Sequence, residues 1–277
     1  MREIRHGSEL KAGDVGARIG RADLVPTAGA PVHDASAAPW VRRIERAATY
    51  DGRHTAGPHL LIEGLAIAGP LDLWARLPIV VRDCVLVAGA GHWGIHVRPG
   101  GGPVLLLHLT VEGAVSGPAG AGLFVRRDNV VAHRCHVRRF ADGIRASANG
   151  LIVSECLIDD ITHSAGDHND GIQLDGAPSN VAISRCRVAN RHPQTSAVKL
   201  AGRNISVEDC HLSGGGWTLY AGQRDGARDV VVARCVFARE HFARIGHFGA
   251  VTDWARDAAR GFRWHNNRLE DGRALRP

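Results

Sequence analysis

The chain has 277 residues, of which 44% are hydrophobic, with a formal net charge of +6 and a pI near 9.4. This length can bury a full core, in one domain or two, and no apolar run reaches the roughly 18 residues that a membrane-spanning helix needs. The start, MREIRHGSELKAGD, lacks the apolar core of a signal peptide. We therefore expect a soluble chain without an export signal, and the sequence leaves its localisation open.

Basic residues outnumber acidic ones, with 34 Lys and Arg against 28 Asp and Glu. Such an excess would suit an acidic polymer. A compositional explanation is also available, because nearly all of these residues are Arg, as in the products of GC-rich genomes. No nucleic-acid-binding module is recognisable. We expect an acidic polysaccharide or oligosaccharide as the partner, no nucleic acid and no membrane, and a homo-oligomer is a further expectation.

Residues 1–57 do not follow the pattern of the remaining chain and form the first of two expected regions, an arm followed by a helix. The segment SAAPWVRRIERAATY (36–50) predicts that helix, with Ser36 as its N-cap and Pro39 in its first turn. The first coil of a stacked repeat exposes an apolar end that must be covered. The helix is therefore expected to cap the repeat that follows.

Residues 58–277 form the second region and carry an internal repeat that the six Cys residues mark. Each Cys lies in the same local frame, as in GLIVSECLI and NVVAHRCHV, and none forms a CxxC pair. Each frame holds two short segments of alternating apolar residues with a polar pair between them, which predicts a strand, a bend and a second strand. Including three segments without Cys, the repeat positions are Leu65, Cys84, Leu109, Cys135, Cys156, Cys186, Cys210, Cys235 and Asn267.

A third short segment follows nearly every frame, as in GIHVR, GLFVR, GIRAS, GIQLD, AVKLA and TLYAG. Three short strands per turn of about 25 residues are typical of a right-handed parallel β-helix, whose coils bury their inner faces against one another. The sequence therefore predicts an all-β, single-domain right-handed parallel β-helix with an N-terminal helical cap. The Cys side chains would form an inward ladder, with metal binding and disulfides as the alternatives, and Asn267 would hydrogen-bond inside the stack.

The third strands predict a column of side chains on one outer face. In GIQLD the apolar residues point inward, so Gln173 and Asp175 point outward, and the same rule applies to the neighbouring coils. The spacing along this column is about 5 Å per coil. Its predicted members are His96, Phe124, Arg145, Gln173, Lys199 and Tyr220.

A polar corner precedes these strands, and its densest part is the stretch DHNDGIQLDG (167–176). Asp142 and Asp170 each stand before Gly, a turn signature that needs no further role. The accompanying His168 and the long insertion before Asp170 favour the edge of a binding groove instead. Further predicted substrate contacts are Arg145, Gln173, Asp142, Arg126 and Trp217.

The repeat resembles the pectate-lyase-like right-handed β-helix superfamily over roughly residues 58–277. The segments HNDGIQ, SAVKL and LSGGGWTLY are similar to those of bacterial β-helix proteins grouped with polysaccharide-degrading enzymes. That superfamily includes lyases, hydrolases, epimerases, phage tailspikes and binding proteins. The resemblance therefore implies the fold and leaves the function open among several classes.

A lyase that cleaves a uronate-containing glycan by β-elimination is the first functional hypothesis. The resemblance implies Lys or Arg as base and Ca²⁺ or Arg as neutraliser of the substrate carboxylate. Lys199 is the only Lys after Lys11, which makes it the candidate base, with Tyr220 as proton donor and with Asp170 and His168 beside them. Ca²⁺ is the expected cofactor, held by Asp167, Asp170 and Asp175.

Two alternatives remain open. A glycoside hydrolase would use paired carboxylates, either Asp142 with Asp170 or Asp170 with Asp175. HNDG resembles the Asn-x-Asp-Gly motif of polygalacturonases, but the further Asp pair and the Gly-His-Gly of those enzymes are absent. A non-catalytic protein that binds a glycan, or forms part of a phage-tail-like assembly, is the other alternative.

Overall fold

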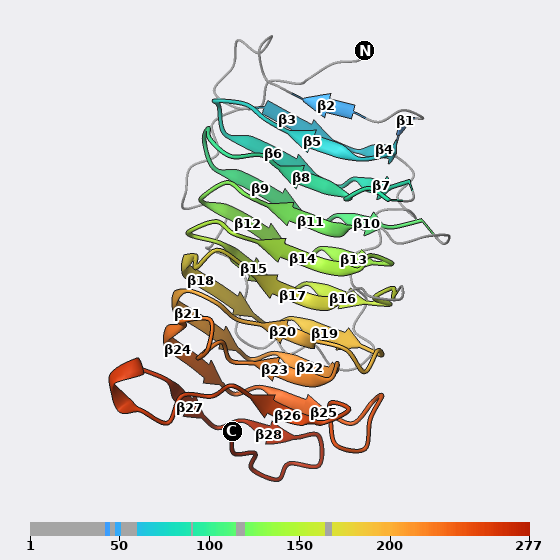
Figure 1. The fold of residues 1–277 in the computed structure, drawn as a ribbon. Helices are drawn as coiled ribbons and strands as arrows, with labels where there is room; N and C mark the ends of the chain where they lie inside the picture. The colour runs from blue at the N-terminus through green and yellow to red at the C-terminus, as the bar shows by residue number, and fades with distance from the viewer. Residues whose placement is uncertain (1–41, 45–47, 51–59, 90, 115–119, 164–167) are drawn as a thin grey trace.

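The computed structural model describes residues 42–44, 48–50, 60–89, 91–114, 120–163 and 168–277. These residues form a β-solenoid in which three parallel sheets run the length of the molecule and successive coils stack one below another (Figure 1). Each coil contributes one strand to each sheet, in the order sheet C, sheet A, sheet B. The predicted all-β parallel β-helix is confirmed.

Sheet C contains the first strand of each coil, which ends before the polar turn. Its nine strands are hydrogen-bonded in the order in which the coils follow along the chain. They are β3 (Leu60–Glu63), β6 (Ile79–Arg82), β9 (Val104–Leu107), β12 (Val130–His133), β15 (Ile152–Ser154), β18 (Ser179–Ser184), β21 (Arg203–Glu208), β24 (Arg228–Ala233) and β27 (Arg263–His265).

Sheet A contains the second strand, which starts just after the Cys position. Its ten strands are β1 (Arg42–Ile44), β4 (Leu65–Ala68), β7 (Val85–Val87), β10 (Thr110–Glu112), β13 (His136–Arg138), β16 (Leu157–Asp159), β19 (Arg187–Asn190), β22 (His211–Gly214), β25 (Val236–Ala238) and β28 (Arg268–Leu269).

Sheet B contains the third strand of each coil and carries the candidate site. Its nine strands are β2 (Ala48–Tyr50), β5 (Leu71–Leu73), β8 (Ile95–Val97), β11 (Ala121–Val125), β14 (Asp142–Ala146), β17 (Asp170–Leu174), β20 (Ser196–Lys199), β23 (Trp217–Tyr220) and β26 (Gly249–Thr252). A short 3₁₀ helix spans Ala258–Arg260. None of the helices that the structure describes has the length and apolar character needed to cross a membrane.

The prediction of a helix over residues 36–50 is wrong where the structure describes this segment. Arg42–Ile44 pairs in parallel with β4, and Ala48–Tyr50 pairs with β5. The open edges of the first complete coil offer unpaired backbone groups, and pairing with them outweighs the local helical pattern. The rest of the predicted helix and the arm before it lie outside the described residues.

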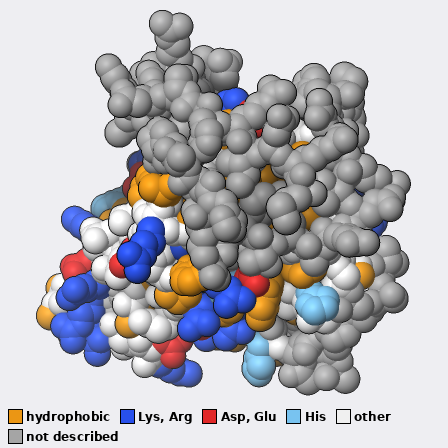
Figure 2. Space-filling model, turned by 90° about the horizontal axis from the view of Figure 1, so that it is seen from above, with side chains coloured by type: hydrophobic (Ala, Val, Ile, Leu, Met, Phe, Trp, Pro, Cys, Tyr) orange, Lys and Arg blue, Asp and Glu red, His pale blue; other side chains and the backbone are white. Residues whose placement is uncertain are grey.

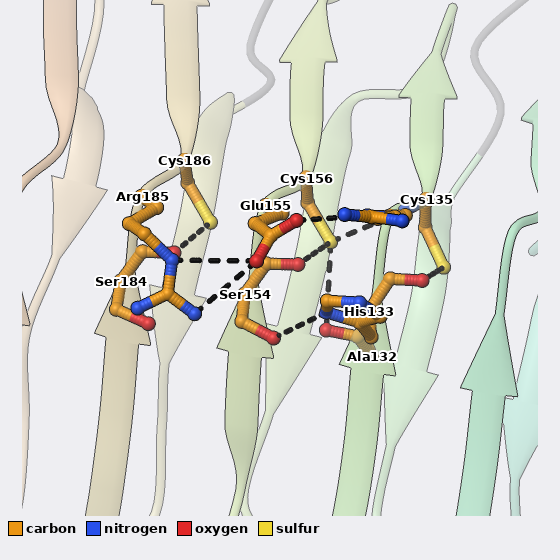
Figure 3. Close-up of polar contacts among 10 residues, drawn as sticks. Ala132, His133, Cys135, Ser154, Glu155, Cys156, Ser184, Arg185 and Cys186 are labelled. Carbon is orange, nitrogen blue, oxygen red and sulfur yellow. Dashed lines mark hydrogen bonds and ion pairs between the residues drawn. The ribbon is translucent and has the colours of Figure 1, made fainter. Parts of the chain in front are cut away.

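The inward Cys ladder is confirmed. All six thiols are free and buried. Cys135, Cys156 and Cys186 lie in one row on successive coils (Figure 3). Cys156 Sγ lies 3.3 Å from the carbonyl oxygen of Ser154 in its own coil and 3.5 Å from that of Ala132 in the coil before. Burial raises the pKa of the Cys156 thiol well above its usual value, so this thiol stays protonated and unreactive.

The polar residues between the first two strands form ion pairs from coil to coil. Glu155 accepts from Arg134 of the coil before, at 2.8 Å, and from Arg185 of the coil after, at 3.3 Å (Figure 3). All three residues have positive φ, between 52° and 54°. Non-Gly residues rarely adopt this conformation, and here it turns the chain sharply before each Cys. These contacts fix the register that places the outer column of sheet B.

Asn267 replaces Cys in the last coil and is confirmed as an inward hydrogen-bonding residue. It is 2% exposed. Its Oδ1 accepts from the Cys235 N–H at 2.8 Å, and its Nδ2 donates to the Val232 carbonyl at 2.8 Å. The amide therefore joins the last coil to the coil above it by two hydrogen bonds, where the coils with Cys at this position use weaker sulfur contacts.

Replacement of Asn267 by Ala is expected to destabilise the protein by about 2 kcal/mol, because it leaves the buried Cys235 N–H without an acceptor. Cys156→Ala removes a thiol whose sulfur accepts only a weak bond from the Cys135 N–H, at 3.4 Å, and should cost less, about 1 kcal/mol. Urea unfolding of the two variants measures the difference. Asn267→Cys restores the repeat and should lie between them. An Asn267→Ala variant as stable as Cys156→Ala would show that the amide bonds contribute little.

Candidate functional site

A groove of about 780 Å³ runs across the outer face of sheet B. Its lining side chains come from β11, β14, β17, β20 and β23 and from the corners that precede strands of this sheet. The lining residues are Trp93, Gly120, Ala121, Phe124, Ala141, Asp142, Arg145, His168, Asp170, Gln173, Thr195, Lys199 and Tyr220. The groove thus brings together seven of the residues predicted to form the site, namely Asp142, Arg145, His168, Asp170, Gln173, Lys199 and Tyr220.

Strand pairing produces the predicted column. Phe124 pairs with Arg145, Arg145 with Gln173, Gln173 with Lys199, and Lys199 with Tyr220. The inner neighbours Ile172 and Leu174 are fully buried, which sends the intervening residue outward. Five different side chains therefore follow one another at the strand spacing of about 4.8 Å.

Asp142 is a buried carboxyl group at the corner of the groove, with only 5% of the residue exposed. Its Oδ1 accepts from the Asp170 backbone N–H at 3.0 Å. Burial and the nearby Asp170 carboxylate raise the pKa of Asp142 to about 7. Arg145 approaches Asp142 Oδ2 at 3.8 Å and opposes this shift without cancelling it. Asp142 therefore holds a proton for a large fraction of the time near neutral pH.

Asp170 occupies the same corner one coil later and is 1% exposed. Its Oδ1 accepts a hydrogen bond from the hydroxyl of Ser196. Burial raises the pKa of Asp170 to about 6, although Ser196 and the charge of Lys199 both act to lower it. Two carboxyl groups with raised pKa values thus stand on adjacent coils of one groove, an arrangement typical of functional sites.

Lys199 and Tyr220 are neighbours in the same column. The Lys199 side chain is 32% exposed, and its Nζ lies 3.8 Å from Asp225 Oδ2. Burial and the charge of Asp170 raise the pKa of Tyr220, which keeps its hydroxyl protonated and able to donate. An amine and a phenol therefore face the groove within one strand spacing of each other.

Arg145, Gln173 and Asp175 form a hydrogen-bonded set beside the carboxyl pair. Arg145 Nε donates to Asp175 Oδ2 at 2.7 Å, and Gln173 Nε2 donates to Asp175 Oδ1 at 2.8 Å. Both oxygens of Asp175 are therefore occupied, and Asp175 does not line the groove. Its role here is to orient the two side chains that do.

The expected Ca²⁺ ligands do not form one cluster in the part of the chain that the structure describes. Asp167 lies outside the described residues, and Asp175 is held by Arg145 and Gln173. Within that part, no group of three or more His, Cys, Asp and Glu side chains has the geometry of a metal site. Asp142 and Asp170 are buried carboxyl groups on adjacent coils, and each already accepts a hydrogen bond, Asp142 from the Asp170 N–H and Asp170 from the Ser196 hydroxyl.

Of three further predicted site residues, one lines the groove and two do not. His168 is exposed and lines the groove. Trp217 is not among the lining residues; its ring lies 6.3 Å from that of Phe248. Arg126 is also absent from the lining, and its guanidinium carbon lies 5.7 Å from the centre of the Phe124 ring. Neither side chain lines the groove, and substrate binding by Trp217 and Arg126 stays a prediction.

Among the lining residues that were missed in the sequence, Trp93 and Thr195 have the side chains best able to contact a ligand. Trp93 stands in a corner before β8, whose strand pattern gave no reason to single it out. Thr195 has a φ of 53°, which is costly for a β-branched residue, and its hydroxyl donates to the Asn169 carbonyl. A strained backbone conformation persists only where surrounding contacts hold it in place. Thr195 directly precedes Ser196, whose hydroxyl donates to Asp170.

Comparison with known proteins identifies the fold. A family model described as "Right handed beta helix region" matches residues 80–237. No curated protein matches the sequence. Among solved structures, the chain is similar to the crystal structure of Dettilon tailspike protein (gp208), with a TM-score of 0.41 and 10% sequence identity. That match covers 72% of this chain, which spans 43% of the tailspike chain.

Proposed function

This chain belongs to the right-handed β-helix family, and on that premise we propose that its groove cleaves an acidic, uronate-containing glycan by β-elimination. One observation carries the proposal: Lys199 and Tyr220 pair in register inside a groove that also contains Arg145. Elimination needs a base, a proton donor and a group that neutralises the substrate carboxylate. These three side chains supply one of each.

The proposed reaction is balanced by protein groups. Lys199 Nζ, as the neutral amine, takes the proton from C5 of the uronate. The electrons of that bond form a double bond between C4 and C5 while the bond from C4 to the glycosidic oxygen breaks. The Tyr220 hydroxyl gives its proton to the leaving oxygen. A later proton exchange through solvent returns both side chains to their starting states, and no water adds to the sugar.

The two carboxyl groups can assist rather than repel an acidic substrate. With a pKa of about 7, Asp142 is neutral often enough to donate a hydrogen bond to the substrate carboxylate. Arg145, oriented by Asp175, provides the positive charge. If Ca²⁺ binds, Asp142 and Asp170 would hold it, and it would supply further neutralisation of the substrate carboxylate. Seen from above, the part of the surface that is coloured by residue type has more Lys and Arg than Asp and Glu side chains, in line with the net charge of +6 (Figure 2).

The experiment is an ultraviolet assay for the conjugated double bond on a panel of uronate polymers, run with and without added Ca²⁺. Alginate, pectate, hyaluronan, heparin and glucuronan cover the main linkages. Rising absorbance on one of them supports elimination. Absorbance that stays flat on every polymer, while reducing ends accumulate, would contradict it and indicate hydrolysis. Binding without either signal would indicate a glycan-binding protein.

A hydrolase is the second candidate, and the raised pKa values of Asp142 and Asp170 favour it. Asp142 and Asp170 stand at matching positions on adjacent strands, whose backbones lie about 5 Å apart, and retaining glycosidases use two carboxyl groups at a short separation. One would act as acid and the other as nucleophile. Elimination ranks first because a hydrolase that uses Asp142 and Asp170 would leave the adjacent Lys199 and Tyr220 without a role.

A further inference from the structure

One end of the groove is aromatic and contains none of the proposed catalytic side chains. The Trp93 ring centre lies 4.9 Å from that of His96 and 5.5 Å from that of Phe124, and the rings of His96 and Phe124 are stacked at 5.0 Å. Trp93 and Phe124 both line the groove. The three rings therefore form one rigid cluster, here called the aromatic end, of which Trp93 is the most accessible member, with 37% of the residue exposed.

His96, the buried member of the aromatic end, favours the neutral form of its ring. His96 is 5% exposed, and burial lowers its pKa, which leaves the ring neutral at neutral pH. Its Nδ1 faces Asp72 Oδ1 at 3.0 Å, and its Nε2 is buried with no hydrogen-bond partner among the described residues. A neutral His96 ring in contact with both Trp93 and Phe124 supports an apolar surface, whereas a protonated one would attract a carboxylate.

The column sets the distance from this end to the proposed chemistry. Phe124 is on β11 and Lys199 is on β20, three strand steps away, which is about 14 Å. A pyranose ring in an extended glycan advances by nearly the same length as one strand step, about 5 Å. A glycan lying along the groove would therefore reach the aromatic end roughly three sugar units from the bond that breaks.

We propose that Trp93, supported by His96 and Phe124, is a remote sugar-binding subsite that stacks on the apolar C–H face of a pyranose ring about three units from the cleaved linkage. This inference rests on the proposed function for the position of that linkage. Aromatic faces bind the C–H side of a sugar, while the charged residues of the groove bind its carboxylates. The subsite would give the protein a preference for chains long enough to span both ends.

The test measures the dissociation constants of uronate oligosaccharides of increasing length by titration calorimetry, in the Lys199→Ala background so that no chain is cleaved. We expect affinity to rise by about tenfold at the length that first reaches Trp93. Trp93→Ala should abolish this step and leave the affinity of shorter oligosaccharides unchanged. Trp93→Phe should restore part of the step.

Trp74→Ala is the matched control, because Trp74 is 47% exposed and does not line the groove. This variant should keep the length step, and thermal unfolding of all variants verifies that they fold. A length step that survives in Trp93→Ala would overturn the subsite. This binding test is independent of the proposed reaction. If the rise in affinity with length depends on Trp93 but wild type never forms a double bond, the subsite is supported and only the elimination is rejected.

Discussion

Lys199→Ala is expected to slow formation of the unsaturated product by a factor of about 10²–10⁴, which is the usual contribution of a positioned acid or base. The variant should still bind the substrate, because Arg145, Gln173 and the aromatic end remain in place. The effect should therefore fall on kcat more than on KM. Initial rates of ultraviolet absorbance across substrate concentrations measure both quantities.

The control for this variant is Lys11→Ala, the same change at the only other lysine. It should leave the rate unaltered. A small primary amine added to Lys199→Ala should restore part of the rate, since it can occupy the vacated space and accept the C5 proton. Full activity of Lys199→Ala would remove Lys199 from the role of base. Loss of binding rather than of turnover would make it a charge contact.

The buried carboxyl pair is expected to make the protein less stable as the pH rises from about 4 to 7. The folded pKa of Asp142 is raised from 3.8 to about 7, so in this range the folded state binds more protons than the unfolded state. Stability then decreases with pH, and the penalty is complete above about pH 7. Asp142→Asn removes this ionisation, so its stability relative to wild type should rise by about 4 kcal/mol between pH 4 and pH 8.

Urea unfolding at several pH values measures this difference. Asp128→Asn is the control, because Asp128 is an exposed carboxyl group outside the groove. Its stability should follow the pH dependence of the wild type. Parallel curves for wild type and Asp142→Asn would mean that Asp142 is ionised in the folded protein without penalty. A cation bound between Asp142 and Asp170 would have that effect, so the series is repeated with a chelator.

The fold could be predicted from the sequence because one coil imposes its pattern on the next. The alternation around Cys156 gives the inward and outward positions, and stacking requires Cys135 and Cys186 to follow the same rule. Asn267 could be placed for the same reason. The N-terminal helix could not, since residues 42–44 have a helical pattern that yields to pairing with β4. A local sequence pattern does not predict the secondary structure of a segment that can pair with the unpaired backbone groups of a sheet edge.

The site could be predicted in part. Strand alternation alone places Arg145, Gln173, Lys199 and Tyr220 in one column, and the structure has them in that register. Side chains in corners obey no such periodicity. Trp93, just before β8, lines the groove, and Trp217, the first residue of β23, does not. The partners of Asp175 were equally hidden, because its link to Arg145 depends on side-chain conformations that cross between coils.

The most direct test of the elimination proposal is to cleave the best uronate substrate in water enriched in heavy oxygen and to determine the masses of the products. Elimination breaks the linkage without adding water. The account therefore predicts products that carry a double bond and no heavy oxygen from the solvent. One heavy oxygen per broken linkage, in products without a double bond, would contradict it and identify the protein as a hydrolase.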